Sequence, residues 1–355
     1  MKRRDFITGV AGLTLSTQVS KAQGNPYFVP SEEQPHALTF MQWPVNRKIY
    51  KDHYFLTLTQ NTIAQIANTI AEFEPVIMLA ASQHHQTIRS KVSGQVELWD
   101  IPTDDLWCRD AGPLFVVDGQ GGLAISQIQF NGWGNKQVHE ADGKIARRVA
   151  QRLDLAFFST GLKGEPGGVE QNGHGLLVAH ESSWLNVNRN PGLNRDQIEA
   201  RLLEAYGAEK VIWSSGVYDQ DITDYHIDAL ARFTGPGRIL MNLPGQTDYN
   251  DPFHLAALDT FDALQAAGLD IDVIPEPDKP RVKALDFVAS YANYYACNGA
   301  IIAAQFGDLE ADSIAKEALR RHYPKREVVM LNVDPLGELG GGIHCATQQM
   351  PQAHS

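Results

Sequence analysis

Hydrophobic positions follow two different periods along this chain, after a polar, proline-rich stretch at residues 24–35. Residues 59–73 place apolar side chains on one face of a helix, and the short apolar run at 75–80 that follows is typical of a buried strand. Apolar runs at 114–117 and 123–128 flank a glycine-rich turn, which predicts a hairpin.

Further elements of both kinds are predicted toward the end of the chain. Helices are expected at about 141–153, 194–206, 252–267 and 310–321, and strands at about 210–214, 237–242, 270–274, 299–304 and 327–332. Strands and helices alternate with no low-complexity linker, which predicts one α/β domain over residues 23–355. The helices recur roughly every 50 to 60 residues, a spacing that suits internal repeats of a propeller as well as an open doubly wound sheet.

The N-terminus carries a basic cluster that leads into a short apolar phase. Arg3 and Arg4 precede Asp-Phe-Ile, and small residues recur up to Ala22, a pattern typical of a twin-arginine export signal. The sequence therefore predicts a signal over residues 1–22, cleavage before Gln23 and export to the periplasm. The alternative is a basic tail. No later stretch has the roughly 18 uninterrupted apolar residues of a membrane-spanning helix.

Composition and charge narrow the classes of partner. The chain has 355 residues, of which 43% are hydrophobic and 20% charged, enough for a sizeable core. The net charge of -12 argues against nucleic acid and anionic membranes, which need a basic surface, and is compatible with a cationic substrate. Residues 161–168 lack the order of a phosphate-binding loop, so no nucleotide cofactor is predicted. The oligomeric state stays open, and a homo-oligomer is compatible with the sequence.

The chain has three cysteines, Cys108, Cys297 and Cys345. A small, odd number of cysteines does not suggest a disulfide framework. Cys345 closely follows three glycines at 340–342, which allow positive φ and a close approach of the backbone to a ligand. A cysteine in such a turn, near cationic or hydrogen-bonding groups, is expected to have a lowered pKa and to act as a thiolate nucleophile. The alternative is a buried structural cysteine.

His226 and Asp228 flank a single apolar residue, Ile227. On a strand, this spacing directs both side chains to the same face. A histidine beside a carboxylate suits proton transfer and the binding of a cation. A metal site with Cys345 as a third ligand is the alternative, although no H-x-H or C-x-x-C pair supports it.

Three other segments carry candidate side chains before or within predicted turns. Asp110 lies before Gly-Pro and a strand, and Trp107 is placed to stack on a planar cation. Glu170 lies between glycines in residues 167–173, and Asn293 leads into a strand. Taken singly, each has a structural interpretation as well, such as a surface ion pair beside a buried tryptophan or a solvated glutamate in a hairpin.

In their order along the chain, these segments resemble the agmatine deiminase family and the related bacterial peptidylarginine deiminases. The resemblance runs from about Phe40 to Pro351 and includes residues 130–134, 188–191 and 340–351. It implies the pentein fold, a single-domain, five-bladed, pseudo-symmetric α/β propeller with its site on the central axis.

The resemblance also implies a role for each candidate residue. The family's nucleophile falls on Cys345, and the two aspartates that hold a guanidinium fall on Asp110 and Asp228. The proton-transfer histidine falls on His226, and the glutamate that assists it falls on Glu170. The expected substrate-binding residues are Trp107, Asp110, Asp228 and Asn293. Thiolate attack on a guanidinium carbon requires no metal and no organic cofactor.

Some positions depart from the family pattern. Tyr225 stands where most relatives have glycine, and Gly168 and Asn172 stand where asparagine or serine and aspartate are expected. Because they lie beside the expected proton-transfer residues, these departures bear on substrate choice or rate.

The substrate prediction depends on missing arginines. Residues 111–143 contain no arginine, in about the region where relatives that act on C-terminal peptidylarginine hold the carboxylate, although Arg147 or Arg148 could substitute. The sequence therefore predicts hydrolysis of agmatine to N-carbamoylputrescine and ammonia. The alternatives are another guanidine, such as peptidylarginine, arginine or a methylated arginine, and a protein that binds guanidines without turnover.

Overall fold

The computed structural model describes residues 26–284 and 286–353. The predicted export signal at residues 1–22 therefore lies outside the described residues. Within the described part of the chain, no helix combines the length and apolar character needed to cross a membrane.

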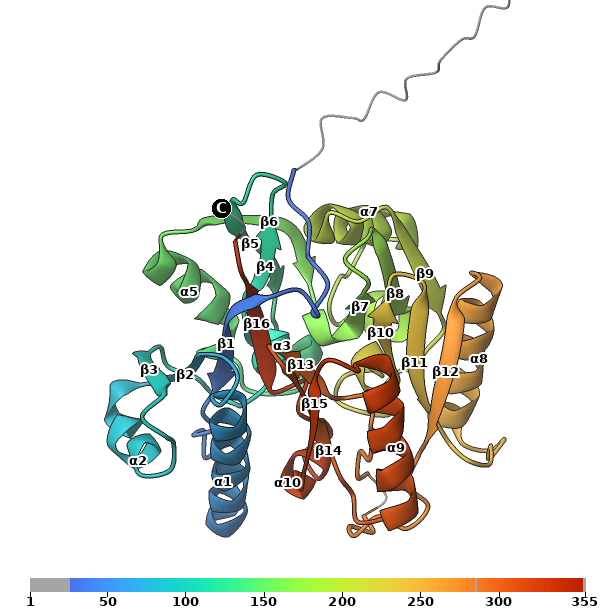
Figure 1. Ribbon diagram of the computed structural model, residues 1–355. Helices are drawn as coiled ribbons and strands as arrows, with labels where there is room; N and C mark the ends of the chain where they lie inside the picture. Colours follow the sequence, from blue (N-terminus) through green and yellow to red (C-terminus); the bar gives the residue numbers. More distant parts are fainter. Residues whose placement is uncertain (1–25, 285, 354–355) are drawn as a thin grey trace, which may run out of the picture.

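The described residues form five small sheets, arranged as the blades of a propeller (Figure 1). The strands are β1 (His36–Gln42), β2 (Val76–Ala80), β3 (Val96–Asp100), β4 (Leu114–Val117), β5 (Leu123–Gln129), β6 (Ala156–Lys163), β7 (Val169–Gln171), β8 (Leu176–His180), β9 (Lys210–Ser214), β10 (Ala231–Gly235), β11 (Arg238–Leu243), β12 (Asp270–Pro275), β13 (Tyr295–Cys297), β14 (Ala300–Ala304), β15 (Glu327–Leu331) and β16 (Thr347–Pro351). The α-helices are α1 (His53–Ile70), α2 (His85–Arg89), α3 (Cys108–Ala111), α4 (Gly132–Asn135), α5 (Ile145–Leu153), α6 (Glu181–Trp184), α7 (Arg195–Tyr206), α8 (Pro252–Ala266), α9 (Leu309–His322) and α10 (Asp334–Gly337). Short 3-10 turns are η1 (Ser82–His84), η2 (Asp142–Lys144), η3 (Pro166–Gly168) and η4 (Ile227–Ala229).

Each blade repeats one pattern of strands. In β4-β5-β6, β7-β8-β9, β10-β11-β12 and β13-β14-β15, the first strand pairs antiparallel with the second, and the second pairs parallel with the third. One long helix, α5, α7, α8 or α9, connects the second strand to the third. The structure therefore confirms the single-domain five-bladed α/β propeller and excludes the open doubly wound sheet.

The remaining blade joins the two ends of the described chain. Its strand order is β16-β1-β2-β3, in which β16 pairs antiparallel with β1 and α1 connects β1 to β2. Figure 1 shows the red strand β16 running beside the blue strand β1. Pairing of the last strand with the first closes the ring of blades.

The ends of the helices follow from local side chains. The N-cap of α1 is Asp52, whose carboxylate accepts hydrogen bonds from the backbone N–H groups of Tyr54 and Phe55, so α1 begins before the predicted residue 59. Helix α7 begins with a capping box between Asn194 and Gln197.

The predicted helices and longer strands coincide closely with α5, α7, α8, α9, β9, β11, β12, β14 and β15. The short first strands β7 and β13 have three residues each, too few to show a clear period.

Candidate active site

The loops before the first strands of the blades converge on one site. Asp110 precedes β4, Glu165 precedes β7, Asp228 precedes β10, Asn293 precedes β13 and Cys345 precedes β16. Because the blades are related by pseudo-symmetry, these equivalent loops lie at the same end of the propeller axis. The fold thus gathers side chains that are far apart in the sequence.

A cavity of about 790 Å³ opens onto these loops. Its lining includes most of the expected residues, namely Trp107, Asp110, His226, Asp228 and Cys345. Asn293 contacts the cysteine directly: its Nδ2 donates to Sγ at 3.0 Å, and its Oδ1 accepts the backbone N–H of Cys345 at 3.3 Å. The size is within the usual range for a small-molecule site.

Each of the two aspartates is held through one carboxylate oxygen only. Oδ2 of Asp110 accepts from the indole Nε1 of Trp133 at 2.9 Å, and Oδ2 of Asp228 accepts from Nδ1 of His344 at 2.7 Å. Within the described residues, Oδ1 of both aspartates is buried and has no hydrogen-bond partner. Buried carboxylate oxygens normally have partners, so the pair is suited to a ligand with several N–H donors.

Two glycines keep the space around these groups open. A side chain at Gly167 would bring its Cβ within 2.5 Å of Oδ1 of Asp110 and 2.9 Å of Nδ1 of His226. A Cβ at Gly341 would lie 2.6 Å from the ring of Trp107 and 3.4 Å from Sγ of Cys345. Both glycines are required by close approach, since neither has a positive φ.

His226 lies between two carboxylates. Its Nε2 is 3.1 Å from Oε2 of Glu165, and its Nδ1 is 3.8 Å from Oδ1 of Asp110. Nε of Arg189 donates to both oxygens of Glu165, at 2.9 and 3.1 Å, and so fixes that carboxylate. Burial lowers the pKa of His226, but Asp110 and Glu165, with Asp228, outweigh it and raise the pKa to about 9. His226 is therefore protonated at neutral pH.

The expected position of Glu170 beside His226 is wrong. Oε2 of Glu170 accepts from Nε of Arg232 at 3.1 Å, and Oε1 accepts from the backbone N–H of Phe233 at 2.8 Å. The carboxylate at His226 belongs to Glu165, which stands just before the Pro-Gly-Gly turn rather than after it. Burial raises the pKa of Glu170 to about 7, even though Arg232 opposes the shift.

Sequence patterns also missed Trp133, His344 and Glu32. Trp133 lies in a stretch that resembles the family, and His344 is adjacent to the nucleophile, so the sequence could have indicated both as site residues. Glu32 lies in the polar stretch before β1 and had none.

The strand expected around His226 and Asp228 is not present. Residues Ile227–Ala229 form the 3-10 turn η4, and His226 is its extended N-cap. Both side chains still face the site, because a Cβ on Gly167 would meet His226 and would lie 3.3 Å from Oδ2 of Asp228.

The lowered pKa expected for Cys345 is also wrong. Burial, followed by the negative charges of Asp228 and Asp110, raises the pKa of the Cys345 thiol well above its ordinary value. The thiol donates to Oδ2 of Asp228 over 3.4 Å. The surrounding groups thus favour the neutral thiol until a positive charge comes close to it.

The two aspartates differ in pKa. Burial raises the pKa of Asp110 to about 6, against the opposing charge of His226. Burial also acts on Asp228, but the hydrogen bond and charge of His344 lower its pKa below the ordinary value. Asp228 is therefore ionised over a wider pH range than Asp110.

The residues that depart from the family pattern are accommodated locally. Tyr225 has a φ of 67°, a conformation that favours glycine, and its ring stacks on His180 with centroids 4.8 Å apart. Asn172 donates to the carbonyl of Pro236, and the carbonyl of Gly168 accepts from the indole of Trp184. Among the residues that the structure describes, no group of three or more His, Cys, Asp or Glu side chains is arranged to hold a metal ion.

Comparison with known proteins agrees with this geometry. A model of the Porphyromonas-type peptidyl-arginine deiminase family matches residues 28–351. An agmatine deiminase of Stutzerimonas stutzeri is 33% identical over 95% of this chain and 99% of its own length, and one of Pseudomonas aeruginosa is 31% identical over 95% and 99%. The solved agmatine deiminase of Enterococcus faecalis superposes with a TM-score of 0.84 at 25% identity, over 93% of this chain and 97% of that one.

Proposed function

This chain belongs to the Porphyromonas-type peptidyl-arginine deiminase family, and from that premise we propose that it hydrolyses agmatine to N-carbamoylputrescine and ammonia. It is then a hydrolase acting on a C–N bond of an amidine. The observation that carries the proposal is that Oδ1 of Asp110 and Oδ1 of Asp228 are buried and have no hydrogen-bond partner among the described residues, while Asp228 also contacts the sulfur of Cys345.

Binding of a guanidinium between the two acids accounts for activation of the nucleophile. The N–H groups of the cation pair with the free carboxylate oxygens and bring its carbon next to the sulfur. The positive charge offsets the two negative charges that raise the pKa of Cys345. The thiol proton passes to solvent as the cation enters, and the thiolate forms in contact with its target.

The first half of the reaction breaks the C–N bond. The thiolate of Cys345 attacks the guanidinium carbon, which forms an S–C bond and a tetrahedral adduct. His226, protonated because its pKa is about 9, gives a proton to the departing nitrogen. Ammonia leaves, and a thiouronium remains on the sulfur.

The second half of the reaction adds water. Neutral His226, held by Glu165 at 3.1 Å, accepts a proton from a water molecule as the water oxygen bonds to the thiouronium carbon. The hydroxyl proton of this adduct passes to the sulfur as the C–S bond breaks, so the ureido product separates from a regenerated Cys345 thiol. The net change is one water consumed and one ammonia released.

The outer part of the cavity supports a substrate with a cationic tail. Among the described residues that line it, Lys283 is the single lysine and no arginine is present, whereas the acids beyond the catalytic pair are Asp105, Asp221, Asp251, Glu276, Asp278 and Asp286. The guanidinium of Arg147 lies over the ring of Phe157, and Arg148 bonds the carbonyl of Pro102, so neither is a carboxylate clamp. A substrate ammonium suits this lining better than a carboxylate does.

Ammonia release from agmatine tests this function. The purified protein is expected to release ammonia from agmatine, and a Cys345→Ala variant to release none above background. A peptide ending in arginine serves as the competing substrate, and we expect kcat/KM for agmatine to be higher. Equal ammonia release by the parent protein and the Cys345→Ala variant would refute the proposal.

Export by the twin-arginine route is a separate proposal that rests on the sequence of residues 1–22. Its test is cell fractionation of the full chain beside a variant in which Arg3 and Arg4 are lysine. Parent protein in the periplasm and variant protein in the cytoplasm support export, and the same distribution for both contradicts it.

A further inference from the structure

We propose that His344 is a positioning residue for this reaction: as an imidazolium bonded to Glu32, it anchors Oδ2 of Asp228 and so turns Oδ1 toward the substrate guanidinium. The inference rests on the proposed function, because it concerns how one acid of the guanidinium site is held. His344 directly precedes the nucleophile in the chain. Its ring contacts two buried carboxylates, those of Asp228 and Glu32.

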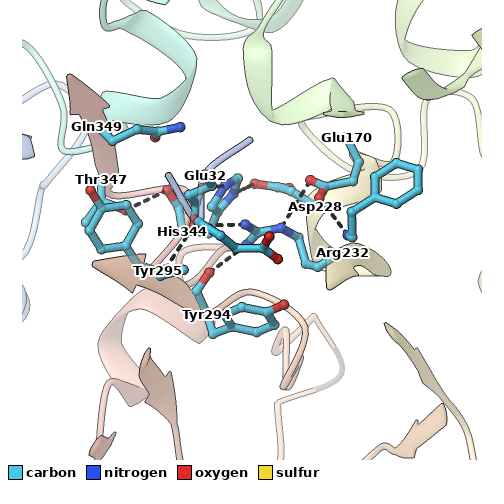
Figure 2. Close-up of polar contacts among 12 residues, drawn as sticks. Glu32, Glu170, Asp228, Arg232, Tyr294, Tyr295, His344, Thr347 and Gln349 are labelled. Carbon is cyan, nitrogen blue, oxygen red and sulfur yellow. Dashed lines mark hydrogen bonds and ion pairs between the residues drawn. The ribbon is translucent and has the colours of Figure 1, made fainter. Parts of the chain in front are cut away.

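Both ring nitrogens of His344 face carboxylates. Nδ1 lies 2.7 Å from Oδ2 of Asp228, and Nε2 lies 2.9 Å from Oε2 of Glu32. Figure 2 shows the ring of His344 between these two acids. An ionised carboxylate only accepts hydrogen bonds, so each ring nitrogen has to carry a hydrogen. A neutral imidazole would direct a lone pair at one of the two acids.

Glu32 is fixed as an anion by groups from several blades. Its Oε1 lies 2.9 Å from Nη2 of Arg232 and accepts the backbone N–H of Ala296 at 2.9 Å, while Oε2 lies 3.1 Å from Nη2 of Arg109. Burial raises the pKa of Glu32, but Arg232 and His344 outweigh it and hold the pKa well below its ordinary value. A permanent negative charge therefore stands behind His344.

The same contacts set the orientation of Asp228. Oδ2 accepts from both His344 and the thiol of Cys345, so the carboxylate cannot rotate without losing two partners. The remaining oxygen, Oδ1, is the one without a partner among the described residues. The titratable or charged groups around Asp228 are His344, Cys345, His226, Asp110, Glu170 and Arg232. His344 is the one that bonds it directly through a ring nitrogen.

Two substitutions at His344 separate its two contacts. Asparagine places an amide nitrogen near the position of Nδ1 and keeps a donor for Asp228, whereas glutamine reaches the position of Nε2 and keeps the contact with Glu32. We expect His344→Gln to raise KM for agmatine about ten- to a hundredfold with a smaller change in kcat, because a hydrogen bond to a charged group is lost. We expect His344→Asn to stay within about threefold of the parent KM, because the bond to Asp228 is retained.

A reagent that alkylates Cys345 reports cation binding between Asp110 and Asp228 without turnover. The test then does not depend on which substrate the enzyme uses. Chloroacetamidine is a planar cation, and chloroacetamide is its neutral counterpart. With either, the sulfur of Cys345 forms an S–C bond as chloride leaves and the thiol proton passes to solvent. The ratio of the two alkylation rates measures the preference for a cation, and His344→Gln is expected to lower it about ten- to a hundredfold.

The pH dependence supplies a readout that a structural role would not change. Loss of the imidazolium in His344→Asn removes the group that lowers the pKa of Asp228, so Asp228 becomes protonated at higher pH than in the parent. The preference for chloroacetamidine is therefore expected to fall at a higher pH in this variant as the solution is acidified.

The control is His322→Gln, which removes a histidine–aspartate contact of 2.9 Å to Asp272 at the end of α9 and is expected to leave the preference unchanged. Equal preferences in the parent and in folded His344→Gln would overturn the inference, as would equal losses in the asparagine and glutamine variants. If His344→Gln does not fold, Glu32→Gln replaces it, and an unchanged preference there overturns the inference too. A parent with no preference for the cation would instead reject the guanidinium site itself, and a parent with the preference but no ammonia release from agmatine would reject only the substrate.

Discussion

The two acids of the guanidinium site have the same chemistry but different anchors. Asp110 is held by the indole of Trp133, a neutral donor, and its pKa rises to about 6 with burial. Asp228 is held by His344, a donor backed by the anion of Glu32, and its pKa is lowered although it is also fully buried. Burial alone would have raised both values. The hydrogen bond and charge of His344, with the charges of His226 and Arg232, lower the pKa of Asp228, whereas the negative charges of Asp228 and Glu165 add to the rise at Asp110.

The comparison shows how one site separates binding from proton transfer. On the Asp228 side, arginine and histidine charges hold an acid that stays ionised across the physiological range. On the Asp110 side, the carboxylate lies 3.8 Å from His226, and both groups titrate close enough to neutrality to respond to the substrate's charge. Asp228 therefore keeps its negative charge for the cation over this range, while the protonation of Asp110 and His226 changes with pH.

Substitution of each acid by its amide should give the largest and most unequal effects. We expect Asp228→Asn to lower kcat/KM for agmatine about a thousandfold, because it removes a guanidinium contact and also leaves a buried imidazolium beside a neutral group. We expect Asp110→Asn to lower it about a hundredfold, since Trp133 and the amide remain compatible. Steady-state kinetics near about pH 8 measures both.

The matched control for these variants is Asp272→Asn, which removes a surface carboxylate paired with His322 and is expected to keep the parent kinetics. Equal losses for Asp228→Asn and Asp110→Asn would show that the two anchors do not distinguish the acids.

The glutamates give a smaller contrast that tests the corrected assignment. We expect Glu165→Gln to lower kcat about tenfold to a hundredfold, because His226 loses its carboxylate partner. The alkaline limb of the pH profile should move to lower pH, since Glu165 raises the pKa of His226. Glu170→Gln should stay within about threefold of the parent, because Glu170 contacts Arg232 and Phe233 instead. A larger kcat loss for Glu170→Gln than for Glu165→Gln would restore the original prediction.

The pH profile of kcat/KM gives the smallest and most specific contrast. Activity should fall below about pH 6 as Asp110 gains a proton and stops attracting the cation, and above about pH 9 as His226 loses the proton that it donates. Trp133→Phe removes a hydrogen bond that lowers the pKa of Asp110, so the acid limb should move to higher pH. We expect less than about a tenfold loss near pH 8. An acid limb that does not move would assign it to another group.

The sequence predicted most long elements because their periods are strong. The helices at 141–153 and 194–206 and the strand at 210–214 match α5, α7 and β9 closely. The first strands β7 and β13 have three residues each, too few to show a period, and the site residues Glu165 and Asn293 lie just before them. Ordered motifs therefore located Asp110, Asp228, Asn293 and Cys345 near one another, where periodicity alone could not.

The errors have physical causes in the surrounding structure. Glu165 and Glu170 flank the same Gly-Gly turn, and only the folded path of η3 shows which carboxylate reaches His226. The pKa of Cys345 depends on two acids from other blades, which a local motif does not contain. Glu32 acts through His344, 312 positions away, and no spacing rule relates residues so distant.

Cys345 directly precedes β16, and the pairing of β16 with β1 closes the ring of blades. The active site is therefore completed in the same folding step that closes the ring. During synthesis, Cys345 does not reach Asp110 and Asp228 until the final strand docks against the first. Contacts of such long range form slowly. Local opening at this seam would separate the nucleophile from Asp110 and from Asp228 while the other blades kept their strands and helices. The enzyme would then lose activity well before it lost most of its secondary structure.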